Sequence, residues 1–276
     1  MKQDPERQVV IPFLKWAGGK QWLTPKLKPL VERTKGRYIE PFLGGGSVFF
    51  ATLPGKALLS DCNPELIDTY QTVRKEATRV IARLRRFSFT KDCYYRVRQS
   101  KPKSPVGRAA RFIFLNRTCW NGLYRVNREG AFNVPMGSFD ATPDFQVAER
   151  LIAAQRALQS ATILCQDFED AIQRAKPGDT VYLDPPYTVA HKNNGFLRYN
   201  ELVFSWYDQQ RLALAARALR ERGCMVILSN VDHPGIADLY KGFRIKKLER
   251  RSLVAGETTK RRLITELLIT SFLTDE

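Results

Sequence analysis

The chain has 276 residues, enough for one large domain or two modest ones, and its hydrophobic fraction of 43% is ordinary for a globular protein. Lysine and arginine number 45 against 28 aspartate and glutamate residues, so the formal net charge is +17 and the pI is near 9.9. This surplus of positive charge indicates a polyanionic partner rather than a role in solubility alone. Nucleic acid is favoured over an anionic membrane surface as that partner.

The cysteine and histidine patterns restrict the kind of protein further. The five cysteines are scattered, no Cys-x-x-Cys pair occurs, and the only histidines are His191 and His233. This usage argues against a zinc site and a disulfide framework, and it predicts reduced thiols in a cytoplasm and no metal. Because no apolar signal core and no run of about 18 apolar residues occurs, we expect neither secretion nor a membrane span.

The first predicted unit is a strand, a glycine-rich turn and a helix. A Gly-Gly pair flanked by lysines at 13–20 could cradle an anion or simply lead into a helix near 25–33. A strand at 38–42 then precedes a turn at 43–47, and a helix begins near Val48. This order is typical of nucleotide-binding α/β folds, although the full Gly-x-Gly-x-x-Gly spacing is missing. Its glycines allow a ligand to approach the backbone closely.

A carboxylate follows the next predicted strand. Residues 57–60 form this strand and Asp61 ends it, about 20 residues after the first strand, where an acidic side chain can bind both hydroxyls of a ribose. A lone aspartate after a strand is more often a helix cap, but the glycine-rich turn upstream favours the ligand role. Asn63 and Pro64 read as the N-cap and first-turn proline of a helix.

Residues from 64 to about 150 interrupt the α/β order with helical, basic sequence. The segment 71–111 has 13 basic and 2 acidic residues, and the segment 241–262 has 9 and 2. Either segment alone could be a solvated helix face, but two such segments on an otherwise balanced chain predict a footprint on phosphates.

An apolar helix around 112–118 runs into a loop rich in Trp, Asn, Gly and Arg that ends near Asn127. Exposed aromatic rings can wedge into a base stack, and Arg and Asn side chains read base edges. The alternative is a tryptophan that packs at a helix end.

The α/β order returns after a helix at 147–159. A strand at 161–166 is followed by Asp167 and Phe168, and the segment 188–204 resembles a loop over the site. A capping box at 205–208 begins a helix that stops at Gly223, and three more strands are predicted at 225–228, 243–248 and 263–270.

The strand at 180–183 ends in the sequence Asp184-Pro185-Pro186-Tyr187. Two prolines form a stiff turn that cannot continue a strand ladder, so the acid and the ring are held at the carboxyl end of a core strand, where α/β sheets bind ligands. A carboxylate, the Pro185 carbonyl and a flat ring suit a planar ring with an exocyclic amine. The alternative is a simple proline-rich turn.

Taken together, the chain resembles Dam-type DNA adenine-N6 methyltransferases over nearly its whole length. The matching motifs occur in the family's order: Phe13-Leu14-Lys15-Trp16-Ala17-Gly18-Gly19-Lys20, Glu40-Pro41-Phe42-Leu43-Gly44-Gly45-Gly46-Ser47, Asp61-Cys62-Asn63-Pro64, Leu115-Asn116-Arg117 through Tyr124-Arg125-Val126-Asn127, Phe132-Asn133-Val134-Pro135 and Asp184-Pro185-Pro186-Tyr187. The resemblance implies a Rossmann-like α/β sheet. It also implies a catalytic domain at 1–63 and 150–276 and a helical, basic target-recognition domain inserted at 64–149.

The resemblance also implies S-adenosylmethionine as methyl donor and N6 of a flipped adenine in double-stranded DNA, usually within GATC, as acceptor. It implies a monomer, in a bacterial or phage-infected cell, that could serve restriction-modification. The expected cofactor residues are Trp16, Lys20, Phe42, Gly44, Gly46, Asp61, Asp167, Phe168 and Asp184. The expected catalytic residues are Asp184, Pro185, Pro186 and Tyr187. The expected DNA-binding residues are Lys15, Trp120, Asn121, Leu123, Arg125 and Asn127.

One departure and two alternatives accompany this resemblance. Relatives often carry Gly-Arg-Tyr where this chain has Gly137-Ser138-Phe139, so a phosphate contact is lost and the last base and the flank preference stay open. An RNA adenine-N6 methyltransferase more often has Asn at the position of Asp184. A catalytically retired DNA-binding regulator would need neither Asp184 nor the glycine-rich turn.

Overall fold

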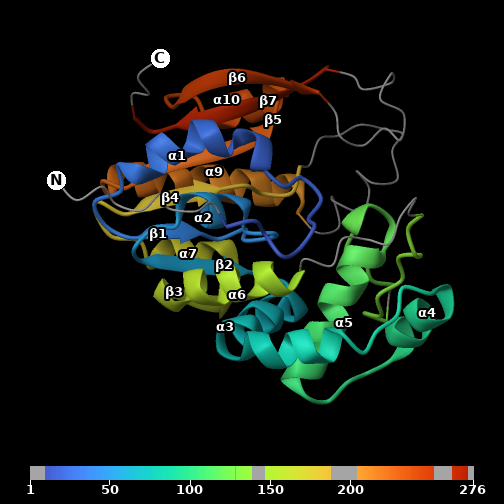
Figure 1. Cartoon of the computed structure of the whole chain (residues 1–276). Coiled ribbons are helices and arrows are strands. Elements are labelled where there is room, and N and C mark those ends of the chain that lie inside the picture. The colour runs from blue at the N-terminus through green and yellow to red at the C-terminus, as the bar shows by residue number, and fades with distance from the viewer. Residues whose placement is uncertain (1–9, 128, 139–146, 188–203, 252–262, 273–276) are drawn as a thin grey trace. The chain divides into compact units, whose positions relative to one another are not determined.

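The structure is a computed structural model that describes residues 10–127, 129–138, 147–187, 204–251 and 263–272 (Figure 1). It has the predicted mixed α/β fold, with a seven-stranded sheet. The chain forms two compact units, one from residues 1–32 and 43–166 and the other from residues 33–42 and 167–276.

The first unit contains two parallel strands and most of the helices. Its elements are η1 (Gln21–Leu23), α1 (Thr24–Glu32), α2 (Ser47–Thr52), β2 (Ala57–Asp61), α3 (Pro64–Leu84), α4 (Lys91–Gln99), α5 (Pro105–Thr118), η2 (Trp120–Gly122), α6 (Val147–Ala157), η3 (Leu158–Ser160) and β3 (Ala161–Cys165). Strand β2 pairs with β3 in register from Ala57↔Ala161 to Asp61↔Cys165. Asp61 therefore lies at the carboxyl end of its strand, as predicted.

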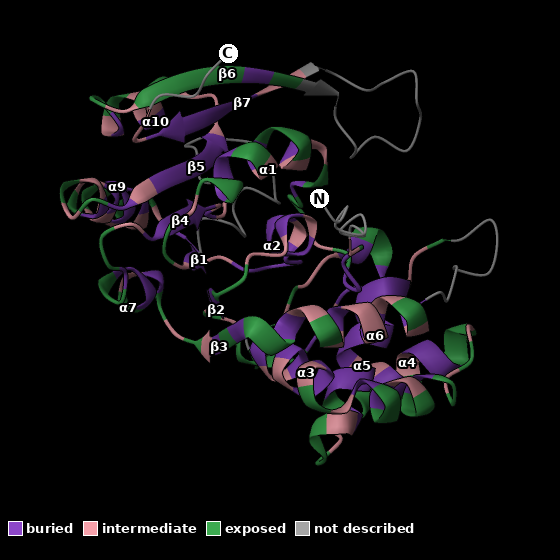
Figure 2. Cartoon of the chain, turned by 60° about the vertical axis from the view of Figure 1, so that its left-hand side comes forward, coloured by how far each residue is buried: buried purple, intermediate pink, exposed green. Residues whose placement is uncertain are grey.

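The predicted helical segment is confirmed for residues 64–118, which contain α3, α4 and α5, whereas the described residues from 119 to 138 are irregular apart from η2. Asn63, Thr90 and Ser104 each cap a helix with a side-chain oxygen, which satisfies N–H groups that a helix start leaves unpaired. Helices α3 and α5 are buried where they face each other (Figure 2). The boundaries of a recognition domain at 64–149 remain a prediction, because compactness alone does not identify the segments that bind DNA.

A kink at Glu76 divides helix α3. Before the kink, the side chains of Gln71 and Arg74 donate hydrogen bonds to the carbonyls of Ile163 and Ala161, at 2.9 and 2.8 Å. The first half of α3 is thus tied to β3.

The second unit contains the other five strands and three described helices. Its elements are β1 (Tyr38–Glu40), α7 (Phe168–Gln173), β4 (Thr180–Leu183), α9 (Trp206–Glu221), β5 (Met225–Val231), α10 (Pro234–Leu239), β6 (Arg244–Arg251) and β7 (Leu263–Thr270). The strand order within it is β1-β4-β5-β7-β6. Strand β4 is parallel to β1 and β5, whereas β7 is antiparallel to β5 and β6. All four β4 residues are buried, so the strand delivers Asp184 from the core.

Three strands differ from the prediction by two or more residues, and β5 runs to Val231 rather than Leu228. Strand β1 ends at Glu40 rather than at Phe42, because Pro41 has no N–H to continue the ladder. Strand β6 runs to Arg251 rather than Leu248, because β7 pairs with it along its whole length. The predicted capping box at the start of α9 is confirmed, with Ser205 and Asp208 bonded reciprocally. The predicted loop at 188–204 lies outside the described residues except for Phe204.

Candidate active site

In the first unit, the glycine-rich turn brings Trp16, Gly44 and Asp61 together. Gly44 and Gly46 have φ of +47° and +66°, in the left-handed region that favours glycine. The Gly44 N–H donates to Asp61 Oδ2 at 3.0 Å. A Cβ atom at Gly44 would lie 2.7 Å from the Trp16 ring, so only glycine allows this approach.

The Asp61 carboxylate also accepts a hydrogen bond from the Asn63 N–H, at 3.0 Å. Burial raises the pKa of Asp61, and the backbone N–H groups of Gly44 and Asn63 offset part of that rise. The helix cap is not Asp61 but Asn63, whose Oδ1 accepts from the Leu66 N–H at 3.1 Å. Asp61 is therefore a half-buried acceptor at a strand end, which can take further hydrogen bonds from hydroxyl groups.

Trp16 and Lys20, the other two predicted cofactor residues of this unit, contact other residues of the same unit. The Trp16 ring stacks on Tyr124, with the centroids 6.1 Å apart. The Lys20 side chain is buried, and its Nζ donates to the Gly18 carbonyl at 2.8 Å. Lys20 therefore stabilises the loop that carries Trp16.

In the second unit, the carboxyl end of β4 forms the acidic corner Asp184–Tyr187. Ser229 Oγ on β5 donates to Asp184 Oδ1 at 2.9 Å, and the half-buried Tyr187 donates its hydroxyl to Glu266 Oε2 on β7 at 2.7 Å. Glu266 is only 1% exposed. Both ends of the corner are thus fixed by side chains from neighbouring strands, and burial, Asp184 and Glu266 together raise the pKa of Tyr187.

Further buried polar groups lie close to this corner. The Tyr38 hydroxyl donates to Glu40 Oε2 at 2.9 Å. Burial raises the pKa of Tyr182, and the negative charges of Asp184, Glu40 and Glu266 raise it further. The tyrosine hydroxyls are therefore neutral hydrogen-bond donors beside carboxylates.

Three aromatic rings of the second unit form a cluster. Phe42 stacks on Phe168 at 5.5 Å, and Phe204 lies within 5.7 Å of both rings. The guanidinium of Arg211 lies 4.8 Å from the centroid of Phe168. The structure thus brings together Phe42 and Phe168, two predicted cofactor residues, and Phe204 is packed with them.

The predicted cofactor residue Asp167 is exposed and caps α7. Its Oδ1 accepts from the Glu169 N–H at 2.9 Å and from Arg211 Nη2 at 3.1 Å. Arg211 also forms ion pairs with Glu169 and Asp208 at 2.8 Å, and the Glu169 hydrogen bond is the main reason that the pKa of Arg211 is raised. One arginine of α9 therefore joins α9 to the Asp167–Phe168 pair.

The predicted DNA-binding residues all lie in the first unit, and all except Lys15 lie between helix α5 and Asn133. Trp120 is 50% exposed, so the alternative of a tryptophan packed at a helix end is wrong. Asn121 and Gly122 both have positive φ, of 52° and 63°, which makes the sharp turn after Trp120. Leu123 is half-buried, and Lys15, Asn121, Arg125 and Asn127 are exposed.

Asn116 joins Lys15 to this turn. Its Oδ1 accepts from the Lys15 N–H at 2.8 Å, and its Nδ2 donates to the carbonyls of Lys15 and Gly122 at 2.6 and 3.3 Å. A Cβ at Gly122 would lie 2.5 Å from that of Lys15. Lys15 is therefore held beside the Trp120 turn although more than 100 residues separate them, a role that the motif at 115–117 did not reveal.

Residues 123–127 and 129–133 lie side by side as the two arms of an irregular hairpin. Val126 bridges to Phe132, and Arg125 Nε donates to Asn133 Oδ1 at 2.8 Å. Asn127 Oδ1 accepts from the backbone N–H groups of Glu129 and Ala131 and so shapes the tip. The guanidinium of Arg125 is thereby oriented at the surface before any partner binds.

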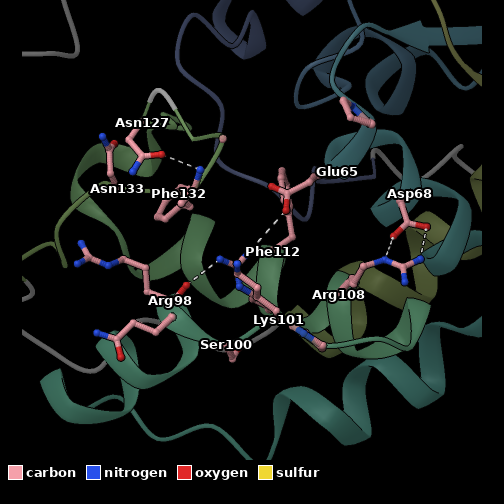
Figure 3. A pocket seen from close by; sticks show the side chains of 16 residues that line it. Glu65, Asp68, Arg98, Ser100, Lys101, Arg108, Phe112, Asn127, Phe132 and Asn133 are labelled. Carbon is pink, nitrogen blue, oxygen red and sulfur yellow. Dashed lines mark hydrogen bonds and ion pairs between the residues drawn. The ribbon is translucent and has the colours of Figure 1, made fainter.

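A cavity of about 710 Å³ lies beside this hairpin (Figure 3). Its basic side chains come from α4, α5 and the segment that joins them: Arg98, Lys101, Arg108 and Arg111. Asp68 and Glu65 pair with Arg108 and Arg111, at 2.8 and 3.6 Å. The cavity therefore carries a net positive charge next to Asn127 and Asn133, and it collects part of the basic segment 71–111.

Two features, a metal-binding group and a membrane-spanning helix, are absent from the described residues. No group of three His, Cys, Asp or Glu side chains in the described ranges is arranged to hold a metal ion. Within the same ranges no helix combines the length and the apolar character needed to cross a bilayer.

Sequence comparisons agree with the resemblance. The family described as D12 class N6 adenine-specific DNA methyltransferase matches residues 16–253. The chain is 39% identical to a type II methyltransferase, M.MjaIII, of Methanocaldococcus jannaschii, and 36% identical to another, M1.LlaDCHI, of Lactococcus lactis subsp. cremoris. These matches cover 95% of this chain and 99% and 95% of the relatives. A DNA adenine methylase of Escherichia coli K12 is 33% identical, over 93% of each chain.

Proposed function

Because the chain belongs to the D12 class of N6 adenine-specific DNA methyltransferases, we propose that it methylates an adenine flipped out of duplex DNA, within GATC or a related short site. The observation that carries this proposal is the Asp184–Tyr187 corner. There a carboxylate lies at the carboxyl end of a buried strand and is held by a buried hydroxyl, while prolines stiffen the backbone.

We propose S-adenosylmethionine as the methyl donor. The chemistry of the residues fits it: Asp61 is an acceptor for ribose hydroxyls, the Phe42–Phe168 pair offers an aromatic face, and the glycines of the turn allow close approach. The residues proposed to hold the donor are Trp16, Lys20, Phe42, Gly44, Gly46, Asp61, Asp167, Phe168 and Asp184. When bound, the donor supplies a methyl group activated by a sulfonium.

The chain's own part in the chemistry is to orient and polarise the adenine amine. That amine is a poor nucleophile, because its lone pair is delocalised into the ring. Hydrogen bonds from its two hydrogens to the Asp184 carboxylate and the Pro185 carbonyl would localise the lone pair and aim it. Tyr187 would stack on the base. As positive charge develops on the amine, a fixed carboxylate stabilises the transition state more than the ground state.

DNA binding is proposed for the first unit. The exposed Trp120 would fill the space that the flipped adenine leaves, and Lys15, Leu123 and Arg125 would contribute base contacts, with Asn121 and Asn127 beside them. The basic cavity beside the hairpin would face phosphates. RNA methylation and a retired site were the alternatives. The family match supports a DNA substrate, and the intact Asp184 supports an active site.

The first test removes the carboxylate. Asp184→Ala should lower methyl transfer by about a thousandfold or more, because the amine loses its acceptor, while affinity for duplex DNA changes by less than about twofold. Tritiated methyl transfer and a fluorescence binding assay measure the two quantities. Asp238→Ala, which removes an exposed acid, is the matched control. Turnover of Asp184→Ala at the wild-type rate would refute the assignment.

The second test defines the site that is read. Methyl transfer is measured on duplexes varied one base pair at a time, starting from GATC. Arg125→Ala should relax discrimination at one base pair by about 1–3 kcal/mol, because its guanidinium is presented at the surface by Asn133. A uniform loss across all duplexes would instead identify Arg125 as a phosphate contact.

A further inference from the structure

Behind the acidic corner, a chain of buried hydroxyl groups reaches Asp184. Ser229, in the middle of β5, is 0% exposed, and its Oγ donates to Asp184 Oδ1 at 2.9 Å. The Tyr182 hydroxyl, on β4, lies 3.0 Å from the same Oγ. A serine hydroxyl has one hydrogen, which here goes to Asp184, so Tyr182 must be the donor in the second bond. The order of donation is therefore Tyr182 to Ser229 to Asp184.

Building on the proposed role of Asp184, we propose that Ser229 is a positioning residue for methyl transfer, which holds the Asp184 carboxylate in the orientation that receives the amine. Pro185 and Pro186 restrict the main chain at the corner, but they leave the side-chain torsions of Asp184 unconstrained. A hydrogen bond from a neighbouring strand supplies that constraint. The Ser229 hydroxyl in turn accepts a hydrogen bond from the buried Tyr182 hydroxyl, which aligns it.

The charges around Asp184 give the same hydroxyl a second effect. Asp184 contributes to raising the pKa of Tyr38 and Tyr182, on β1 and β4, and of Tyr187 in the corner itself. The carboxylates of Glu40 and Glu266 also raise the pKa of Tyr182, so Asp184 shares this buried region with other acidic groups. A hydroxyl that donates a hydrogen bond to a carboxylate favours its charged form, and Ser229 is such a donor to Asp184.

The experiment compares Ser229→Ala with Ser271→Ala in the full-length enzyme. Ser271 is a matched control, because its Oγ also bonds to β5, accepting from the Val226 N–H at 2.9 Å, but it does not bond to Asp184. Ser229→Ala should lower the single-turnover rate by about 10- to 100-fold, with donor and DNA affinities unchanged. The acid limb of its pH–rate profile should move to higher pH, because a carboxylate that loses a hydrogen-bond donor is harder to ionise. Ser271→Ala should keep the wild-type rate and profile.

A second variant covers the case in which Ser229→Ala fails to fold. Ser229→Cys keeps the side-chain volume closely but is a weak donor, so it should give an intermediate rate and a smaller pH shift. Wild-type rates and profiles in the folded serine variants, with Asp184→Ala inactive, would overturn the role of Ser229 and leave the proposed function intact. An active Asp184→Ala would instead overturn the proposed function.

Discussion

In the first unit, Asp61 receives hydrogen bonds from the main-chain N–H groups of Gly44 and Asn63. In the second unit, Asp184 receives one from the side chain of Ser229, and Tyr187 donates to the side chain of Glu266. Both carboxylates end parallel strands, but Asp61 is held mainly by backbone N–H groups, with the Cys62 side chain beside them, whereas the Asp184 corner is held by side chains.

This difference determines which substitutions would disturb the first half of the candidate site, around Asp61, and the second half, around Asp184. Only proline removes a backbone N–H, and it changes the main-chain conformation as well, so Asp61 loses these bonds mainly when the turn that aims the N–H groups is distorted. A side-chain donor can be removed alone, so the second half can lose its alignment one bond at a time while the strands stay in place. The following variants test this contrast.

The largest effect is expected from Gly44→Ala. Its φ is in the left-handed region and its Cβ would meet the Trp16 ring, so the turn must move and the N–H that bonds to Asp61 must move with it. We expect affinity for S-adenosylmethionine to fall by more than about tenfold and stability by about 1–3 kcal/mol. Calorimetry and chemical denaturation measure these values.

The matched control for this variant is Gly55→Ala. Nothing lies within 4 Å of a Cβ at Gly55, and its φ is not in the left-handed region. Donor affinity should therefore stay at the wild-type value. If both alanine variants bound the donor normally, the backbone-held turn would not be a cofactor element.

An intermediate effect is expected from Arg211→Met. The change removes the bonds to Asp167, Glu169 and Asp208 and the cation that lies over Phe168, while it keeps an unbranched apolar side chain. We expect donor affinity to fall by about three- to tenfold, because Asp167 and Phe168 lose their alignment with α9.

Helix α9 offers a matched control for that variant in Arg220→Met. Arg220 also bonds to a carbonyl, that of Gly242, and lies 4.7 Å from the ring centroid of Phe243. Within the described part of the chain it contacts neither Asp167 nor Phe168, so its loss should leave donor affinity unchanged. Equal affinity losses in both variants would show a general effect of α9 stability instead.

The smallest effect on donor affinity is expected from Asp179→Asn, which changes no residue of the proposed donor site and acts on stability instead; backbone and side-chain bonds meet at this carboxylate. Burial alone would raise the pKa of Asp179, but the N–H groups of Arg37 and Lys176 and the Arg37 guanidinium, at 2.9 Å, lower it overall. The charged form therefore stabilises the fold above about pH 4, and that contribution is lost as pH falls through the lower folded-state pKa.

At neutral pH, the asparagine variant should be less stable by about 1–3 kcal/mol, and the difference should shrink as pH falls below about 4. Urea denaturation over a pH series measures it. Asp238→Asn removes an exposed ion pair with Lys241 and should change stability by less than about 1 kcal/mol. A stability difference that is independent of pH would contradict the ionic account.

The sequence predicted the first half of the candidate site better than the second. Gly44, Asp61 and Asn63 lie within 20 residues, so a strand, a turn and a cap were enough to relate them. The sequence alone does not decide whether the Trp120 ring is exposed as a wedge or packed at the helix end, because an aromatic residue at a helix end has the same sequence pattern in either case. Its exposure, and the bonds of Asn116 that draw Lys15 to it, required the folded chain.

The sequence by itself determined the order of the strands, the helix caps at Asn63 and Ser205, the Asp-Pro-Pro-Tyr corner and the family, because these depend on near neighbours and on motifs in order. Only the tertiary structure decided that Ser229 and Glu266 hold the two ends of that corner and that Arg211 reaches Asp167. A serine in a buried strand or an arginine on a helix carries no local signal of its partner, since strand pairing and helix packing select that partner from distant parts of the chain.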